Sequence, residues 1–473
     1  MLFNSYTFLV FFASVLTLYY ASRSWRRRKA ILLGASYLFY AAWNPPFVVL
    51  LWISTVADWV AARGVYRSDS RHRRRFFVAL SLAVNLGLLG YFKYGGFVLE
   101  NFLVLVRSLG WDLTLAAPNI ILPIGISFYT FQTLSYTLDV YRGRTAPTDS
   151  FLDYALYVTF FPQLVAGPIV RAVDFLPQCE RPKNLSGQAI GWGLFLMLFG
   201  LFEKMALADG LMAPITEAIY DAPARLDFVS AWAGTFAFAS QLFFDFAGYS
   251  LVAIGAAMCL GFTIGDNFRF PYAAVGFSDF WRRWHISLST WLRDYIYIPL
   301  GGSHHGLFWA AVALSVTMLL GGLWHGAAWT FVVWGVLHGT FLVVERAIRA
   351  WSPRRLPDHP VAQVPVGLLT FLLVCFAGVF FRSPSFAKAF DVTAALFSFQ
   401  LTGVERTLAP ESIVIALGVT ALLLLSHWLL RNRSLVQVAA RVPWWGRSFA
   451  LAAMLLGIIG LSGDDRAFIY FQF

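Results

Sequence analysis

Charged side chains are scarce in this 473-residue sequence. Lysine, arginine, aspartate and glutamate together make up only 13% of it, whereas hydrophobic residues make up 59% and aromatic residues 18%. Soluble globular domains carry about 25% charged residues. The composition therefore excludes a soluble protein and predicts a polytopic membrane protein.

Strands of alternating polarity are missing as well. A membrane β-barrel needs strands of about ten residues in which apolar and polar side chains alternate. Residues 8–20, 76–90 and 368–381 are instead continuously apolar. A membrane helix needs about 20 apolar residues, and the chain has apolar runs for about eleven to thirteen such helices, with shorter runs that suit re-entrant or interfacial helices. We therefore expect an all-α bundle.

Cysteine is rare, and no two cysteines are spaced for metal binding. Cys179, Cys259 and Cys375 are scattered along the chain without a CxxC pair, and two of them lie in apolar runs. Unpaired cysteine is among the most buried residue types and packs as a small apolar side chain. We expect neither a disulfide framework nor a thiolate metal site.

The sequence also has no sign of a cleavable signal peptide. Its first residues carry no basic segment, and no small-residue cleavage site follows the first apolar run. The first helix should therefore be retained, with the amino terminus translocated. Basic residues cluster at 23–29 and 67–75, and the positive-inside rule places these segments in the cytoplasm. The net charge of +11 comes largely from such loops. It therefore suits anionic membrane lipids as partners and does not indicate nucleic acid.

The pattern of polar residues and prolines divides the chain into four parts. They are amino-terminal membrane helices at 1–145, a core of broken and interfacial helices at 146–345, carboxy-terminal membrane helices that look like scaffold at 346–463, and an aromatic tail at 464–473. In the core, Pro162 and Pro168 interrupt an apolar run and Asp245 lies among aromatic residues. Broken backbone at membrane depth persists only inside protein or beside a wet cavity. The core should therefore form a cavity wall.

One informative stretch of the core is residues 277–302, FSDFWRRWHISLSTWLRDYIYIPLGG. Its aromatic and apolar side chains recur at three- and four-residue spacing, so they lie on one face of a helix. This face consists of Trp281, Trp284, His285, Leu288, Trp291, Leu292 and Tyr295. The pattern is typical of an interfacial amphipathic helix with an aromatic belt. That interpretation leaves His285 unexplained, and a functional role for this imidazole stays open.

The second informative stretch is residues 318–340, MLLGGLWHGAAWTFVVWGVLHGT, which places His325 in an apolar run of helix length. Titratable groups inside a membrane helix are rare and suggest function. The alternative is a structural hydrogen bond to a neighbouring helix. His338 lies too far along the helix to share a metal with His325 in an i, i+4 arrangement, so we expect no zinc site.

These two stretches resemble the core of the membrane-bound O-acyltransferase family. Within it, they are most similar to the bacterial branch that contains the inner-membrane subunit of alginate O-acetylation. The resemblance extends to LPIGISFYTFQTLSY at 122–136, FFPQLVAGPIVR at 160–171, QLFFDFAGYS at 241–250 and FIYFQF at the carboxyl terminus. It implies a helical bundle around a central tunnel in the bacterial inner membrane, with both termini on the periplasmic side.

The resemblance also implies roles for individual residues. The catalytic histidine of the family matches His325, and its second signature position matches His285. Asp245, Trp324 and His338 are expected to line the cavity. In this family the terminal aromatic motif is thought to carry an acyl group on its tyrosine, here Tyr470. As plain chemistry, the same tail is an interfacial aromatic anchor.

The leading hypothesis is an acetyltransferase without a bound cofactor. It would take an acetyl group from cytoplasmic acetyl-CoA for O-acetylation of an exported polysaccharide, with alginate as first choice. Its expected partners are a periplasmic SGNH-type acetyltransferase and the polysaccharide export machinery. The alternatives are D-alanyl transfer to teichoic acid and a structural scaffold for an export complex. A proton-coupled transporter or flippase is a further alternative, and it would use Asp245, Glu203 and the histidines as a proton relay. Many such transporters are built from internal repeats, and the sequence shows none.

Overall fold

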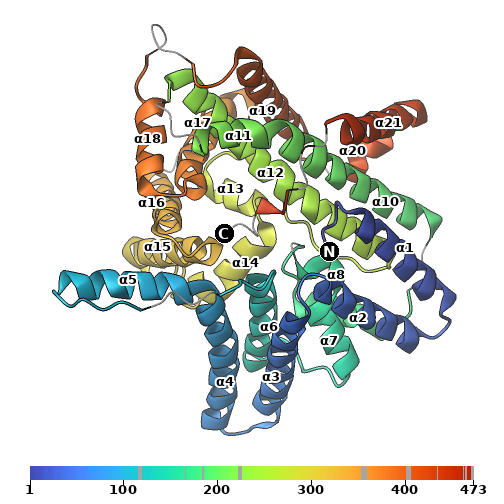
Figure 1. Ribbon diagram of the computed structural model, residues 1–473. Coiled ribbons are helices and arrows are strands. Elements are labelled where there is room, and N and C mark those ends of the chain that lie inside the picture. The colour runs from blue at the N-terminus through green and yellow to red at the C-terminus, as the bar shows by residue number, and fades with distance from the viewer. Residues whose placement is uncertain are drawn as a thin grey trace. The chain divides into compact units, whose positions relative to one another are not determined.

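Helices are the regular secondary structure of the described residues, and loops connect them (Figure 1). The computed structural model describes residues 1–473 except 116–119, 166, 184–185, 222–225, 353–358, 401–405, 434, 462, 464–465 and 470–473. Within these residues there is no β-strand, which agrees with the expected all-α class. The helices divide into two compact units, and each unit is described separately.

The first unit comprises Met1–Met197 and Ala253–Gly265. It contains α1 (Tyr6–Ala21), α2 (Trp25–Ala41), α3 (Val48–Arg67), α4 (Arg71–Leu89), α5 (Gly95–Ser108), α6 (Ile126–Tyr141), α7 (Phe151–Thr159), α8 (Phe161–Leu164), α9 (Ala172–Glu180) and most of α10 (Gly187–Leu201). The chain turns at Pro45 and Pro46 between α2 and α3, because proline cannot continue a helix. It also breaks at Phe160 between α7 and α8, next to the expected interruption at Pro162.

The second unit comprises Leu198–Val252 and Asp266–Phe473. It contains a π-helical segment (Phe202–Met212), α11 (Ala213–Tyr220), most of α12 (Phe228–Cys259), α13 (Phe277–Arg283), α14 (Ile286–Leu292), a π-helical turn (Arg293–Tyr297), α15 (Gly306–His325), α16 (Trp329–Trp351), α17 (Pro360–Arg382), α18 (Phe386–Leu396), α19 (Pro410–Leu430), α20 (Leu435–Arg441) and α21 (Trp444–Leu461).

Two kinds of side chain hold the first unit together. Phe11 of α1 packs edge-to-face on Phe161 of α8, with their ring centroids 5.3 Å apart, inside a larger cluster of phenylalanines. Between α3, α4 and α6, the fully buried Asp58 accepts hydrogen bonds from Thr137 at 2.6 Å and Asn85 at 2.5 Å. Buried polar groups persist where such partners satisfy them.

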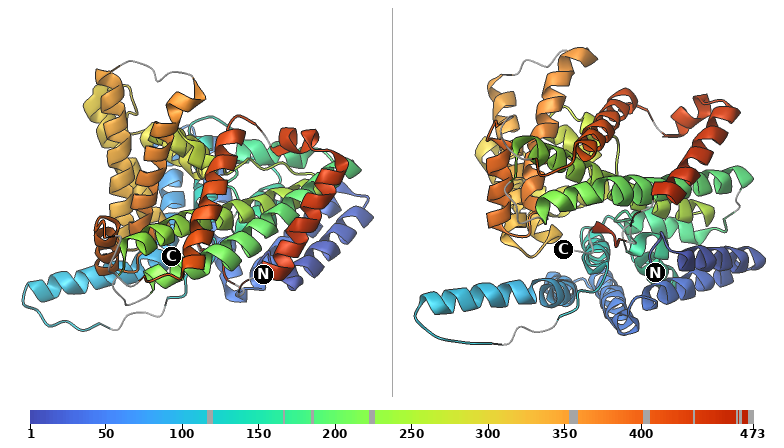
Figure 2. Two further views of the ribbon diagram at one scale, coloured as in Figure 1. Left: turned by 90° about the horizontal axis from the view of Figure 1, so that it is seen from above. Right: turned by 45° about the horizontal axis from the view of Figure 1, so that its top comes forward.

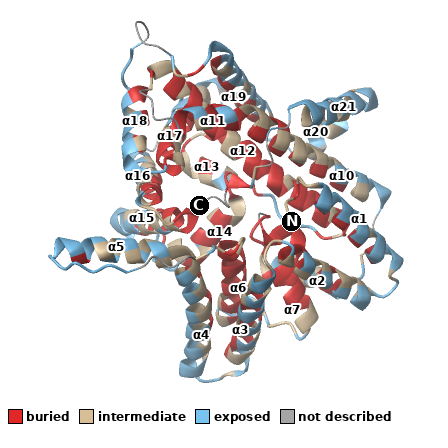
Figure 3. Cartoon of the chain, viewed as in Figure 1, coloured by how far each residue is buried: buried red, intermediate tan, exposed pale blue. Residues whose placement is uncertain are grey.

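Nine helical segments among the described residues are long and apolar enough to cross a membrane. They are Pro45–Arg67, Arg71–Ser108, Gly187–Tyr220, Phe228–Cys259, Gly306–His325, Trp329–Trp351, Val361–Arg382, Pro410–Leu430 and Trp444–Leu461. α12 is the most buried of them, whereas α21 has no buried residue (Figure 3). α21 runs beside the π-helical segment Phe202–Met212 (Figure 2). The exposed apolar faces suit contact with lipid.

The predicted continuous helix at 277–302 is wrong. α13 ends at Arg283, His285 adopts a left-handed backbone conformation, and α14 begins at Ile286. The aromatic stripe is also not an interfacial belt, because Trp284, Leu288 and Trp291 are buried within the second unit. Periodicity alone does not reveal a break that other parts of the fold impose.

The predicted helix at 318–340 is wrong in the same way. α15 ends at His325, Gly326 and Ala328 are extended, and α16 begins at Trp329. The two helices then pack antiparallel, since Gly322 lies against Gly335. His325 therefore occupies the last position of a helix and not its middle.

Candidate active site

His285 lies at the break between α13 and α14, with φ 41° and ψ 56°. Residues other than glycine rarely adopt this left-handed conformation, and it carries strain that neighbouring contacts must offset. Asn267 supplies those contacts, because its carbonyl oxygen accepts the backbone N–H of Ile286 at 2.9 Å. The break is therefore set by Asn267, which precedes it in the chain.

The same asparagine determines which ring nitrogen of His285 carries the proton. The Oδ1 atom of Asn267 accepts the backbone N–H of Ser287 at 3.3 Å and its hydroxyl at 2.8 Å, so this side of the amide is an oxygen. His285 Nδ1 lies 3.1 Å from that oxygen and must donate to it. The lone pair is then on Nε2. Complete burial lowers the pKa of His285 to about 3, so the imidazole is neutral near pH 7.

His325 is brought next to His285 by the end of α15. Its side chain is only 3% exposed, and the two imidazole centroids lie 6.5 Å apart. Trp324 contacts both rings, at 5.9 Å from His285 and 5.1 Å from His325. Two segments separated in the sequence thus supply adjacent imidazoles in an aromatic, buried setting.

Aromatic residues of α16 and α17 cover the other side of His325. Its ring centroid lies 4.9 Å from that of Trp334 and 5.3 Å from that of Phe381. Trp334 also contacts His338 at 4.7 Å. Trp334, His338 and Phe381 line a cavity, and Cys375 of α17 lines it as well. The expectation that 346–463 is plain scaffold is therefore wrong for α17.

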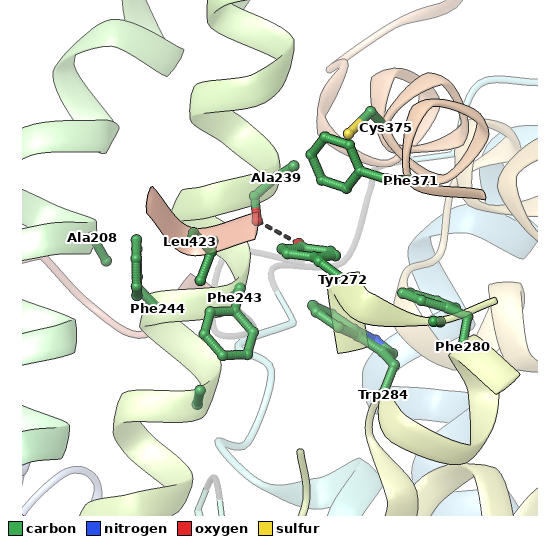
Figure 4. Packing of buried hydrophobic residues seen from close by; sticks show 12 residues of the cluster. Ala208, Ala239, Phe243, Phe244, Tyr272, Phe280, Trp284, Phe371, Cys375 and Leu423 are labelled. Carbon is green, nitrogen blue, oxygen red and sulfur yellow. Dashed lines mark hydrogen bonds between the residues drawn. The ribbon is translucent and has the colours of Figure 1, made fainter. Parts of the chain in front are cut away.

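The rest of the cavity wall comes from α12 and from residues 271–284 (Figure 4). Tyr272 and Trp284 face it, and the Tyr272 hydroxyl donates to the carbonyl oxygen of Ala239 at 2.6 Å. Most of the lining is apolar, while His338 places a titratable group in the wall. Such a pocket suits a small, largely apolar group near the His325 imidazole.

Asp245 of α12 forms part of a buried ionic cluster. Its Oδ1 lies 2.5 Å from Nζ of Lys204, which lies 2.8 Å from Asp209 as well. The other oxygen of Asp245 accepts the backbone N–H of Ile469 at 2.7 Å. The cluster thus connects α12 to residues near the carboxyl terminus.

The tail is only partly described. Phe468 is fully buried and lies 5.3 Å from Phe246, whose ring lies 4.6 Å from His285. Tyr470 lies outside the described residues, so the interpretations of its hydroxyl stay predictions. Among the described residues, no group of three or more histidine, cysteine or acidic side chains is placed to hold a metal.

The family model for the membrane-bound O-acyltransferases matches residues 144–381. This range contains both histidines, Trp324 and the cavity-lining part of α17. The chain belongs to the membrane-bound O-acyltransferase family. It is therefore a multi-pass membrane protein and an O-acyltransferase, as the resemblance had implied.

Several curated relatives are similar to this O-acyltransferase over most of its length. A probable alginate O-acetylase AlgI of Azotobacter vinelandii is 43% identical and aligns over 84% of this chain and 78% of its own. The corresponding protein of Pseudomonas putida is 38% identical over the full length of both chains. A peptidoglycan O-acetyltransferase of Helicobacter pylori is 32% identical over 94% of this chain and 91% of its own.

Sequence reasoning missed several residues of this acyltransferase site. Lys204 lies in the same apolar run as Glu203, so the rarity of intramembrane charge could have indicated it. Asn267 and Phe381 carry no such signal, because a single amide in a polar segment and one phenylalanine among many are not distinctive. Their roles depend on contacts between distant segments.

Proposed function

We propose that this O-acyltransferase passes an acetyl group from a cytoplasmic donor across the bacterial inner membrane, for O-acetylation of an exported polysaccharide. The observation that carries the proposal is the pair of buried imidazoles, His285 and His325, with centroids 6.5 Å apart. Similarity to relatives named alginate O-acetylases supports alginate as the polymer. The relative named peptidoglycan O-acetyltransferase makes peptidoglycan the second candidate.

His325 acts as the general base. Its neutral imidazole takes the proton of an attacking hydroxyl while the oxygen forms a bond to the thioester carbonyl carbon. The carbon–sulfur bond then breaks, and the proton passes to the departing thiolate. General-base catalysis of this kind contributes about 10²- to 10⁴-fold in rate. His285, neutral and held by Asn267, accepts a hydrogen bond at its Nε2 lone pair and so positions His325, whose second ring nitrogen carries the proton to donate.

The first hydroxyl to be acylated is that of Tyr470. The described part of the tail supports this role, because Phe468 and the neighbouring Ile469 are buried near Phe246 and His285 is in contact with Phe246. An ester on this tyrosine would then pass the acetyl group to a periplasmic SGNH-type transferase. That partner, working with the export machinery, completes the transfer to the polymer.

The donor is acetyl-CoA, which reaches the site from the cytoplasm and is a substrate and not a resident cofactor. Basic segments at 23–29 and 67–75 place their loops on the cytoplasmic side, against anionic lipid headgroups. Both termini then lie on the periplasmic side, where a tail that delivers an acyl group to a periplasmic partner must be.

The membrane-spanning helices number about eleven to thirteen, arranged around a tunnel. Besides the nine long segments, α1, α2 and α6 have 16, 17 and 16 residues. Helices of this length rise about 24 to 26 Å. They can cross the membrane where the bilayer thins locally.

Three alternatives fit the site less well. A proton relay through Asp245 and Glu203 is disfavoured because Asp245 is engaged by Lys204 and the Ile469 amide. D-alanyl transfer to teichoic acid is disfavoured because the acyl-carrying motif is usually supplied there by a separate small protein. A purely structural scaffold leaves the strained backbone of His285 without a purpose.

The test replaces His325 with alanine and measures acetyl ester on the exported polymer. Ester content should fall at least a hundredfold, as expected for loss of a general base, while the abundance of the protein in the membrane stays unchanged. His72→Ala is the control, because His72 is exposed in the first turn of α4 and is not among the residues of the site. It should keep most acetylation. Acetylation retained in His325→Ala would refute the base assignment.

A further inference from the structure

The carboxyl-terminal segment of the chain folds back onto α12. The backbone N–H of Ile469 donates to Oδ2 of Asp245 at 2.7 Å, and both residues are at most 4% exposed. Phe468 packs between Phe246, at 5.3 Å, and Tyr249, at 4.6 Å. Residues distant by more than two hundred positions thus make a buried, directional contact.

An ion pair makes a second contact with the segment, at its start. Arg466 lies 2.8 Å from Glu217 of α11, with both side chains partly exposed. Exposed ion pairs contribute little to stability, so this contact orients the segment weakly. The hydrogen bond to Asp245 is different, because a charge-assisted bond in a buried site is strong and has a defined direction.

Lys204 orients the carboxyl group of Asp245 toward the segment. Its Nζ lies between two carboxylates, at 2.5 Å from Asp245 and 2.8 Å from Asp209, and it is 2% exposed. With Oδ1 of Asp245 turned toward Lys204, Oδ2 faces the Ile469 amide. A buried ion pair adds little net stability compared with apolar packing, whereas it does fix geometry.

The contact lies beside the two histidines. Phe246, the neighbour of Asp245, is in edge-to-face contact with His285 at 4.6 Å. A slip of the segment by one residue would take Phe468 out of its contacts with Phe246 and Tyr249.

We propose that Asp245, oriented by Lys204, is a positioning residue that binds the Ile469 amide and so sets the register of the carboxyl-terminal segment at the active site. Phe246 and Tyr249 form the pocket for Phe468 that completes this register. The inference rests on the proposed function in one respect, namely that the segment held by this contact carries the acyl-accepting tyrosine in its sequence.

The first measurement is independent of catalysis. Hydrogen–deuterium exchange of the terminal peptide is followed by mass spectrometry in the purified full-length protein. Asp245→Leu removes the acceptor, and Ile469→Pro removes the donor while it leaves the Asp245–Lys204 pair in place. Both should raise the exchange rate at least about tenfold, as expected for loss of a bond to a charged group. Ile469→Val keeps the N–H and should stay within about threefold of the parent protein, whereas Asp245→Asn keeps a neutral acceptor oxygen and should exchange at a rate between those of the parent protein and Asp245→Leu.

The second measurement is polymer acetylation by the same four variants in cells. Asp245→Leu and Ile469→Pro should lose at least about tenfold, while Ile469→Val retains most activity and Asp245→Asn loses less than Asp245→Leu. Unchanged exchange in Asp245→Leu and Ile469→Pro would overturn the proposed contact. Faster exchange with unchanged acetylation would overturn its role in positioning.

These outcomes separate the inference from the proposed function. Failure of the proposed function shows as acetylation that survives His325→Ala or Tyr470→Phe. The exchange measurement needs no turnover and still decides whether Asp245 holds the segment. If Asp245→Leu does not accumulate in the membrane, Ile469→Pro decides, since it leaves the Lys204 cluster intact.

Discussion

At the scale of single residues, the site depends on one asparagine that the sequence does not distinguish. Asn267 bonds the Ile286 amide, the Ser287 amide and the His285 imidazole. It thereby holds the strained backbone of His285 and selects the tautomer of its ring. A histidine signature in the sequence indicates the residue but not its protonation, which depends on this partner.

The buried state of His285 makes stability depend on pH. Its pKa is about 3 in the folded protein against an ordinary value of 6.5, so the unfolded chain binds a proton that the native site excludes. Stability is therefore lost as the pH falls from 6.5 toward 3. His285→Asn keeps a donor for Asn267 and tolerates the left-handed conformation, but it does not titrate.

Thermal unfolding in detergent between pH 7.5 and pH 5 checks this expectation. The parent protein should lose about 2 kcal/mol more stability at pH 5 than His285→Asn does. Parallel pH curves for the two proteins would show that His285 is not a buried neutral imidazole. Because His285 stays neutral across this range, it should add no ionisation to the pH profile of acetylation either.

At the scale of elements, the α15–α16 hairpin positions His325. Gly322 and Gly335 let the two helices approach so closely that a Cβ atom on Gly322 would clash with the carbonyl oxygen of Phe331 and lie 3.2 Å from the Gly335 amide. His325 follows within one helical turn, at the last position of α15. The distance between α15 and α16 therefore controls the position of the His325 imidazole.

Gly322→Ala should force the hairpin apart. We expect a loss of about 1 to 3 kcal/mol, as is typical of overpacking, together with reduced acetylation because His325 is displaced. Thermal unfolding and polymer ester content measure the two effects. Gly418→Ala in α19 is the matched control, since a Cβ there meets nothing within 4 Å. It should be neutral or stabilising by up to about 1 kcal/mol. Equal behaviour of the two variants would contradict the packing argument.

Helices were predictable from the sequence, and their interruptions only in part. Long apolar runs and the prolines after α2 and α7 indicated where helices lie and end. The breaks at His285 and Gly326 were not foreseen, because both stretches keep helical spacing across the break. Tertiary contacts decide there, from Asn267 in one case and from α16 in the other. Local periodicity carries no information about such partners.

At the scale of the whole molecule, charge asymmetry is the strongest signal in the sequence. Family motifs indicated both histidines, and the structure brings them together with Trp324. The pairing of Lys204 with Asp245 could not be predicted, because the two residues share no pattern. The proposed direction of acyl transfer, in contrast, depends on the topology that the concentration of arginine in particular loops predicts.

The two ends of α3 test that topology. Pro46 precedes α3 and Ser70 follows it, and both are exposed at opposite ends of the span Pro45–Arg67. The arginines at 67–75 place Ser70 in the cytoplasm and Pro46 on the periplasmic side. In right-side-out inner-membrane vesicles, a membrane-impermeant maleimide should therefore label Pro46→Cys and spare Ser70→Cys.

The three native cysteines are buried, so they give little background in this experiment. Opening the vesicles with detergent should make Ser70→Cys reactive and leave Pro46→Cys unchanged, which serves as the internal control. Labelling of Ser70→Cys in intact vesicles would invert the orientation of α3. The donor would then have to enter from the periplasm, where acetyl-CoA is not made, and the proposed direction of transfer would fail with it.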